Sequence, residues 1–133
     1  MSLTKKIHDK IHDMLTSPIP VWMRMRMDEL ERGHVIIQPG TVPWLPVEEW
    51  HDTDCVSIAD GEVRLVAIWA KYPGTGAFRR LVEGILDCGL VPVVVAPLDH
   101  MVAILVAWGW QHSYVGNSFE DWEDQWRPPE DWT

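Results

Sequence analysis

The sequence predicts an α/β (α+β) fold in which helices flank a mixed β-sheet. An Asp-Gly pair joins two β-rich runs within residues 54–70, which indicates a hairpin. A glycine turn and a helical pattern then separate the run 63–70 from a second apolar run at 91–96. We expect these two runs to pair in parallel through a right-handed crossover. With 133 residues, of which 47% are apolar, the chain suits one domain.

The first third of the chain is less regular than the rest. Apolar residues at three- and four-residue spacing predict an amphipathic helix over 3–15. The pattern that follows fits either a strand or a helix, and we expect a short helix over 24–32 that ends before a glycine. HVIIQPG, at 34–40, reads as a strand closed by a Pro-Gly turn, and the proline-rich segment 41–50 reads as a connection.

The rest of the chain alternates strands and helices. The hairpin turns at 59–62, where Glu62 is expected to be solvated, and its second strand is apolar on both faces, as in a sheet interior. The elements expected after it are a helix over 78–88, a buried strand over 91–97, a largely apolar helix over 99–110 and a strand over 111–116.

The last 17 residues differ from the rest in composition. Six acids and one arginine occur in 117–133, and no strand pattern is present. We therefore expect one domain over 1–116 and an acidic, Trp-rich tail over 117–133. Trp122, Trp126 and Trp132 could pack back on the domain, contact a second copy of the chain, or dock a partner protein.

Charge and cysteine content exclude several classes of protein. A net charge of −9 with only eleven basic residues argues against binding nucleic acid through bulk electrostatics. No apolar run is long enough to span a membrane, and the start of the chain does not resemble a signal peptide. Cys55 and Cys88 are too few for a disulfide framework or a zinc site, so we expect a cytoplasmic protein. His8 and His12 are one helical turn apart but lack an identifiable third ligand, so no metal is expected.

The glycine turn is the strongest candidate for a binding site. Gly74 and Gly76 lie between an expected strand and an expected helix. A helix that begins directly after a strand exposes backbone N–H groups and the positive end of its dipole, so it can hold a phosphate. Thr75 could cap this helix, and Lys71 and two arginines lie nearby. The same glycines would equally serve a βα turn without a ligand.

Two motifs at matching separation resemble the GCN5-related N-acetyltransferase (GNAT) family. That family carries Arg or Gln, two residues, Gly, one residue, then Gly or Ala, and KYPGTG at 71–76 matches except for its first lysine. The family's later segment is a strand and a helix that ends in Leu-Tyr, three residues and Gly-Phe. PVVVAPLDHMVAILVAWGW is similar to it, with Ile104, Leu105, Gly109 and Trp110 in those four places. The resemblance covers about 55–116.

The resemblance implies a fold and a cofactor. The fold would be a three-layer α/β/α arrangement around a GNAT-like mixed sheet, and the cofactor would be acetyl-CoA. Its pyrophosphate would lie on the amides of 74–77 and its pantetheine arm along 68–70, where the two parallel strands splay apart. The cofactor-binding residues implied are Ile68, Trp69, Ala70, Lys71, Gly74, Thr75, Gly76 and Ala77. An unidentified amine would attack the thioester directly, with a backbone N–H near Ile68 or Trp69 stabilising the oxyanion.

Two departures from the family leave catalysis open. The tyrosine that commonly protonates the leaving thiolate is Leu105 here, and the chain opens on a helix rather than on the family's N-terminal strand. His100, with Asp99 before it as the expected N-cap, is our candidate for proton transfer, and Tyr114 could replace the missing acid. A non-catalytic protein of the same fold, acting through CoA or protein contacts, and an α/β domain without a ligand remain the alternatives.

Overall fold

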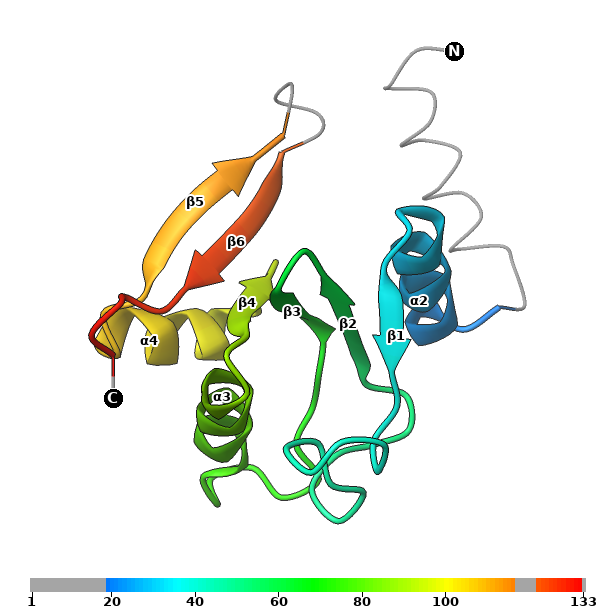
Figure 1. Cartoon of the computed structure of the whole chain (residues 1–133), viewed down its shortest axis with the longest axis horizontal. Coiled ribbons are helices and arrows are strands. Elements are labelled where there is room, and N and C mark those ends of the chain that lie inside the picture. Colours follow the sequence, from blue (N-terminus) through cyan, green and yellow to red (C-terminus); the bar gives the residue numbers. More distant parts are fainter. Residues whose placement is uncertain (1–18, 117–121, 133) are drawn as a thin grey trace.

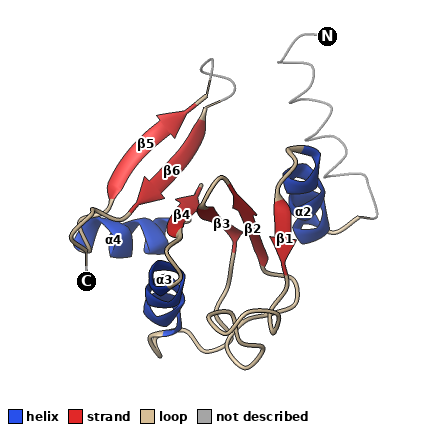
Figure 2. Ribbon diagram, in the orientation of Figure 1, coloured by secondary structure: helices blue, strands red, loops and turns tan. Residues whose placement is uncertain are grey.

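The computed structural model describes residues 19–116 and 122–132, which form one six-stranded mixed sheet with helices packed against it (Figure 1). The strands lie in the order β1-β2-β3-β4-β6-β5. Figure 2 separates strands from helices by colour. The elements are α2 (Val21–Glu31), β1 (Val35–Ile37), β2 (Cys55–Ala59), β3 (Glu62–Ala67), α3 (Ala77–Asp87), β4 (Val91–Val95), α4 (Asp99–Ala107), β5 (Gln111–Val115) and β6 (Glu123–Arg127). The helix expected over 3–15, with His8 and His12, lies outside the described residues.

The two faces of the sheet meet different partners. Side chains alternate along a strand, so Val63 and Leu65 of β3 share one face while Arg64 lies on the other. Val63 and Leu65 belong to the buried hydrophobic core, together with residues of α3 and α4 such as Leu81 and Leu105. Arg64 instead contacts Glu29 of α2. This places α2 on one face and α3 and α4 on the other, in agreement with the expected α/β/α layers.

The hairpin β2–β3 forms as predicted. Asp60 and Gly61, with φ of 52° and 78°, both adopt the positive values that a tight two-residue hairpin turn needs. All five residues of β2 pair with β3, but Cys55 pairs with Ala67 whereas its neighbour Val56 pairs with Leu65. Val66 is therefore the extra residue of a β-bulge, which bends the strand and increases its twist.

The parallel pairing of β3 with β4 is also confirmed, but it is short. The register runs from Glu62 opposite Val91 to Leu65 opposite Val94 and stops there, at the bulge. The chain of β3 continues in extended form to Ala70, which bridges to Trp50 in the preceding connection. Beyond Leu65 the two strands therefore separate, which leaves a gap at their carboxyl ends.

The largest correction concerns the C-terminal segment. We expected no strand after residue 116, whereas β6 lies inside the sheet, antiparallel to both β4 and β5. Trp126 packs into the core and is 7% exposed. The sequence EDQWR hid this strand because the face opposite Trp126 carries Glu123, Gln125 and Arg127, so no apolar alternation is visible. Packing of the tail tryptophans on the domain is confirmed for Trp126 and Trp132.

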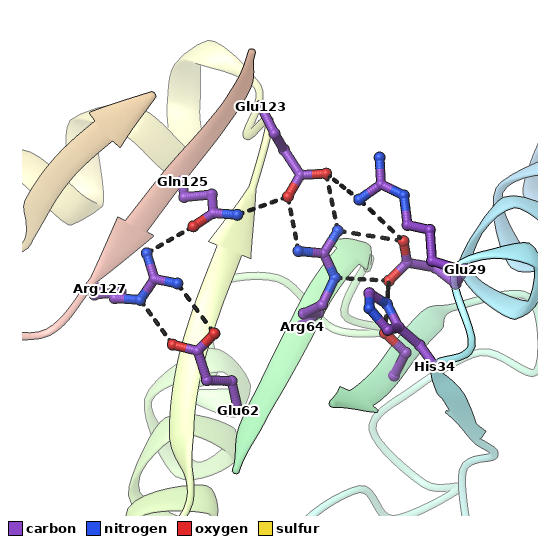
Figure 3. Close-up of polar contacts among 9 residues, drawn as sticks. Glu29, His34, Glu62, Arg64, Glu123, Gln125 and Arg127 are labelled. Carbon is purple, nitrogen blue, oxygen red and sulfur yellow. Dashed lines mark hydrogen bonds and ion pairs between the residues drawn. The ribbon is translucent and has the colours of Figure 1, made fainter. Parts of the chain in front are cut away.

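A network of ion pairs fastens β6 to the rest of the sheet (Figure 3). Arg64 donates to Glu29 at 2.8 Å and to Glu123 at 2.7 Å, so one guanidinium joins α2, β3 and β6. Arg127 donates to both carboxylate oxygens of Glu62, at 2.9 and 3.0 Å. The expectation that Glu62 is merely solvated was therefore wrong, because β6, which the sequence pattern did not reveal, brings Arg127 to it.

Smaller differences concern the ends of the other elements. Helix α2 begins at Val21 rather than at 24, directly after Pro20, and ends at Glu31 before Gly33. Strand β1 spans only three residues of the expected 34–40. None of the helices that the structure describes is both long and apolar enough to cross a bilayer.

Candidate functional site

The glycine turn joins the end of β3 to α3 in a conformation that only glycine adopts readily. Gly74 and Gly76 have φ of 82° and 83°, and Gly76 is the N-cap of α3. Thr75 does not cap the helix as expected, because its hydroxyl donates to the Tyr72 carbonyl at 2.7 Å. No side chain caps α3. The N–H groups of its first turn, which begins at Ala77, are therefore left without a side-chain acceptor.

A pocket of about 440 Å³ opens beside this turn. It is called the glycine pocket below and is lined by Trp50, Ile68, Trp69, Ala70, Tyr72, Pro73, Gly74, Gly76, Ala77, Phe78, Arg79, His100, Met101, Ile104 and Trp108. Six of the eight cofactor-binding residues expected from the sequence are among them. The exceptions are Lys71 and Thr75.

The cations near the turn have different partners. Lys71 donates to the Val47 carbonyl at 2.6 Å, and Arg80 donates to Glu49 and to the Thr75 carbonyl. Only Arg79 lines the glycine pocket. Its guanidinium lies 5.1 Å from the centre of the Trp132 ring and donates to Glu83 at 2.9 Å. Arg79 is thus held in place on the pocket wall by the C-terminal segment.

A second pocket of about 330 Å³ lies on the other side of Trp69. It is called the Asp54 pocket below and is lined by Trp22, Met25, Thr53, Asp54, Leu65, Val66, Ala67, Ile68, Trp69, Val94, Val95, Ala96, Pro97, Leu98, His100 and Met101. These residues come from α2, from the segment before β2, from the separating ends of β3 and β4, and from the start of α4. The pocket thus occupies the gap that the bulge at Val66 opens.

Asp54 is a buried carboxylate, with 3% of the residue exposed. It accepts the His51 N–H at 2.8 Å and the Trp69 N–H at 2.9 Å, one on each oxygen. Burial raises the pKa of the Asp54 carboxyl above its ordinary value, and these two hydrogen bonds only partly oppose that effect. The bond to Trp69 also fixes the extended segment between β3 and the glycine turn.

The two pockets meet at four residues, Ile68, Trp69, His100 and Met101, which line both. The rings of Trp69 and His100 lie edge to face with their centroids 5.8 Å apart. His100, our candidate for proton transfer, therefore stands at the junction. Asp99 does not cap α4 as expected: Leu98 occupies the N-cap position and Asp99 begins the helix.

Tyr114, the other residue expected to take part in catalysis, is not at this junction. Tyr114 lies on β5, is 60% exposed and contacts His112 and Trp122, and it lines neither pocket. Leu105, at the position of the family's tyrosine, is fully buried in the core. Burial raises the pKa of the Cys55 thiol to about 11, so this cysteine stays protonated near neutral pH.

Sequence reasoning did not single out Asp54, Trp22 or Met25, which line the Asp54 pocket. Asp54 sits two residues after another aspartate in a polar loop, and nothing in the local pattern distinguishes it as the buried one. Trp22 and Met25 are three residues apart on α2, a spacing that places both on one face of a helix. That spacing was a usable signal, but it does not reveal which element the face meets.

No protein-family model matches the chain, and neither a curated protein nor a solved structure does. Among the described residues, no cluster of His, Cys, Asp or Glu could hold a metal ion.

Proposed function

We propose that this chain is an acetyl-CoA-dependent N-acetyltransferase, which binds its cofactor in the glycine pocket and an amine in the Asp54 pocket. The observation that carries the proposal is the meeting of two pockets of opposite charge where parallel strands separate. Among the described residues that line the glycine pocket, Arg79 is the one that carries a formal charge, which is positive. Among those that line the Asp54 pocket, Asp54 is the one that carries a formal charge, which is negative. A phosphate-bearing cofactor suits the first pocket and a cationic amine suits the second.

The residues of the glycine pocket fit a CoA pyrophosphate. A Cβ built on Gly74 would meet no atom within 4 Å, so its backbone faces open space that a ligand can enter. A Cβ on Gly76 would lie 3.1 Å from an Arg80 nitrogen, so only glycine leaves this approach clear. The uncapped first turn of α3 supplies N–H donors and the positive end of the helix dipole. When bound, acetyl-CoA would supply an acyl group already activated as a thioester.

The strand order supports the same proposal. The pairing of β2, β3 and β4, antiparallel in the hairpin and parallel between β3 and β4, agrees with the mixed sheet that the GNAT resemblance implies for about 55–116. The bulge at Val66 and the end of pairing after Leu65 produce the splay along which the pantetheine arm would lie. Ile68, Trp69 and Ala70 form the edge of this splay.

The chain's own groups would then have separate roles. The amides of Ala77 to Arg79 hold the pyrophosphate, and the apolar wall at Ile104 and Trp108 excludes water. His100, at the junction of the pockets, holds the proton that the attacking amine loses. Because the Trp69 N–H already donates to Asp54, we assign stabilisation of the developing oxyanion to the neighbouring Ile68 N–H.

A second candidate function is CoA binding without turnover. The buried Leu105 favours it, because no tyrosine stands at the place where the family commonly has its acid. In this case acetyl-CoA would bind but no amine would be acetylated. Two unpaired cysteines, one of them exposed, fit the reducing cytoplasm for either function.

Calorimetric titration with CoA tests both candidates, and replacement of Gly76 locates the site. We expect Gly76→Leu to lower the affinity for CoA about tenfold or more, because a side chain there blocks the approach to the first turn of α3. Gly89→Leu is the matched control, since Gly89 has φ of 79° and so imposes the same backbone strain outside the pocket. The absence of binding at millimolar CoA would contradict both functions, and turnover of acetyl-CoA with amines would then separate the two.

A further inference from the structure

The walls of the Asp54 pocket are mostly apolar, and its polar lining side chains include Thr53, Asp54 and His100. Trp22 and Met25 of α2 line it together with Leu98 and Met101, and Trp69 lines both this pocket and the glycine pocket. Among the described lining residues, Asp54 is the only acid and no lysine or arginine is present. Such a lining suits a ligand with one positive charge and a hydrophobic body.

The Asp54 carboxylate has capacity for such a ligand. Each of its oxygens accepts one backbone N–H, whereas a carboxylate oxygen can accept two hydrogen bonds. Arg26, the nearest guanidinium, does not neutralise it by direct contact, because its nitrogen donates to the main-chain carbonyls of Asp54, at 2.9 Å, and of Asp52. Among the described residues, no basic side chain forms an ion pair with Asp54.

The size of the pocket limits the ligand. A cavity of about 330 Å³ is near the lower end of small-molecule sites, which span roughly 300 to 1,000 Å³. Polyamines and aminosugars carry several charges or hydroxyls that would need further polar partners, and the lining, in which Asp54 is the one acid and most other residues are apolar, offers few of them. A single aromatic or branched aliphatic group would instead replace water against the two tryptophans.

We infer that the acceptor is a small hydrophobic primary amine, whose ammonium group lies against the Asp54 carboxylate and whose apolar body lies against Trp22, Met25 and Leu98. This substrate class rests on the proposed function, but the pocket would bind the amine whether or not CoA is present.

Binding of four probes to the full chain, measured by calorimetry without CoA, tests the inference. We expect 2-phenylethylamine to bind about tenfold or more tightly than 2-phenylethanol, which lacks the charge, and than ethylamine, which lacks the ring. Spermidine should bind more weakly than 2-phenylethylamine, because its additional charges would have to be desolvated. The inference would be overturned if the alcohol or ethylamine bound as tightly as 2-phenylethylamine, or if spermidine bound more tightly. It would also be overturned if 2-phenylethylamine did not bind at about 10 mM, a concentration that detects weak binding.

A pair of variants at Leu98 tests the position of the ammonium group. Leu98 is 63% exposed and lines the Asp54 pocket but not the glycine pocket, so its replacement should leave the fold intact. Leu98→Lys and Leu98→Glu remove the same apolar contact and differ in charge. We expect 2-phenylethylamine to bind about fivefold more tightly to Leu98→Glu than to Leu98→Lys. Equal affinities of two variants with the same thermal midpoint would overturn the assignment.

CoA titration of the unmodified chain distinguishes failure of the proposed function from failure of the substrate class. If CoA binds and 2-phenylethylamine does not, the substrate class is wrong and the proposed function stands. If the amine binds with the expected selectivity and CoA does not, the proposed function fails and the amine pocket remains.

Discussion

Arg64 shows how one side chain can connect elements that are far apart in the sequence. It is 7% exposed and lies between Glu29, 35 residues earlier, and Glu123, 59 residues later. Burial disfavours its charge, but the hydrogen bonds to Glu123 and Glu29 outweigh that effect and raise the pKa of Arg64. A buried ion pair adds little to the free energy of unfolding compared with hydrophobic side chains of similar volume in its place. Removal of one partner is costly, however, because it leaves an uncompensated buried charge. Figure 3 shows Arg64 between Glu29 and Glu123, so displacement of β6 would leave the buried Arg64 without one of its two carboxylate partners.

Acid should weaken this network through Glu123. Burial opposes ionisation of Glu123, but hydrogen bonds from Arg64, Gln125 and Arg32 lower its pKa to about 2, from an ordinary value of 4.5. Because the pKa is lower in the folded state, the ionised carboxylate stabilises the fold above about pH 4.5. That contribution, of roughly 3 kcal/mol, should be lost as the pH falls from 4.5 toward 2.

Urea unfolding of the unmodified chain and of Glu123→Gln across this pH range measures the contribution. Other carboxylates also titrate there, so the difference between the two proteins is the relevant quantity. We expect the free-energy difference to be largest at neutral pH and to shrink toward pH 2. A difference that does not change with pH would show that Glu123 stabilises the fold without its charge.

Packing constrains the sequence of helix α3 at one glycine. Gly84 lies in its middle, where glycine costs about 1 kcal/mol relative to alanine. A Cβ at Gly84 would overlap the Cβ of Trp44 and lie 3.4 Å from the Trp44 Cα. Glycine is thus required for close contact with the proline-rich connection that precedes β2, and not for a turn.

This contact predicts that Gly84→Ala destabilises the protein despite the better helix propensity of alanine. Overpacking costs about 1 to 3 kcal/mol, so we expect a net loss of about 1 kcal/mol in the free energy of unfolding. Asp87→Ala, at an exposed position of the same helix, should change it by no more than about 0.5 kcal/mol. A stabilised Gly84→Ala variant in thermal or urea unfolding would contradict the contact with Trp44.

In the whole molecule, the hairpin of β5 and β6 is less firmly attached than the strands β1 to β4. Five residue pairs join β5 to β6, whereas only two pairs, at Val94 and Val95, join β6 to β4 (Figure 1). All five residues of β5 are exposed. The buried Trp126 and the ion pairs of Arg64 and Arg127 supply the remaining attachment.

We therefore expect amide hydrogen exchange to divide the sheet into two parts. The amides of β5 should exchange through local opening of lower free energy than those of Val63 to Leu65, which lie in the buried middle of β3. Exchange measured by mass spectrometry at neutral pH would resolve the two groups. Equal protection of β5 and β3 would mean that the hairpin opens only when the whole domain unfolds.

Local features were predictable from the sequence because they depend on neighbouring residues. Backbone preferences of a few residues predict the Asp60-Gly61 turn and the end of the strand at Gly74 to Gly76. Side-chain periodicity over a few residues predicts the apolar faces of α3 and β4. Their order along the chain also predicted the parallel pairing of β3 with β4. Six of the eight cofactor-binding residues that the resemblance implied line the glycine pocket, and the other residues of its wall come mainly from α3 and α4.

Contacts between distant segments could not be read in this way. Strand β6 is polar on the face that meets Arg64, and its place between β4 and β5 depends on pairing with segments that are distant in the sequence. The carboxylate of Asp54, just before β2, accepts the Trp69 N–H from the segment after β3, a contact at the open end of the hairpin between residues 15 apart. Local chemistry thus specified the elements and the glycine turn, whereas the acid of the site and the sixth strand depend on long-range pairing that leaves no local pattern.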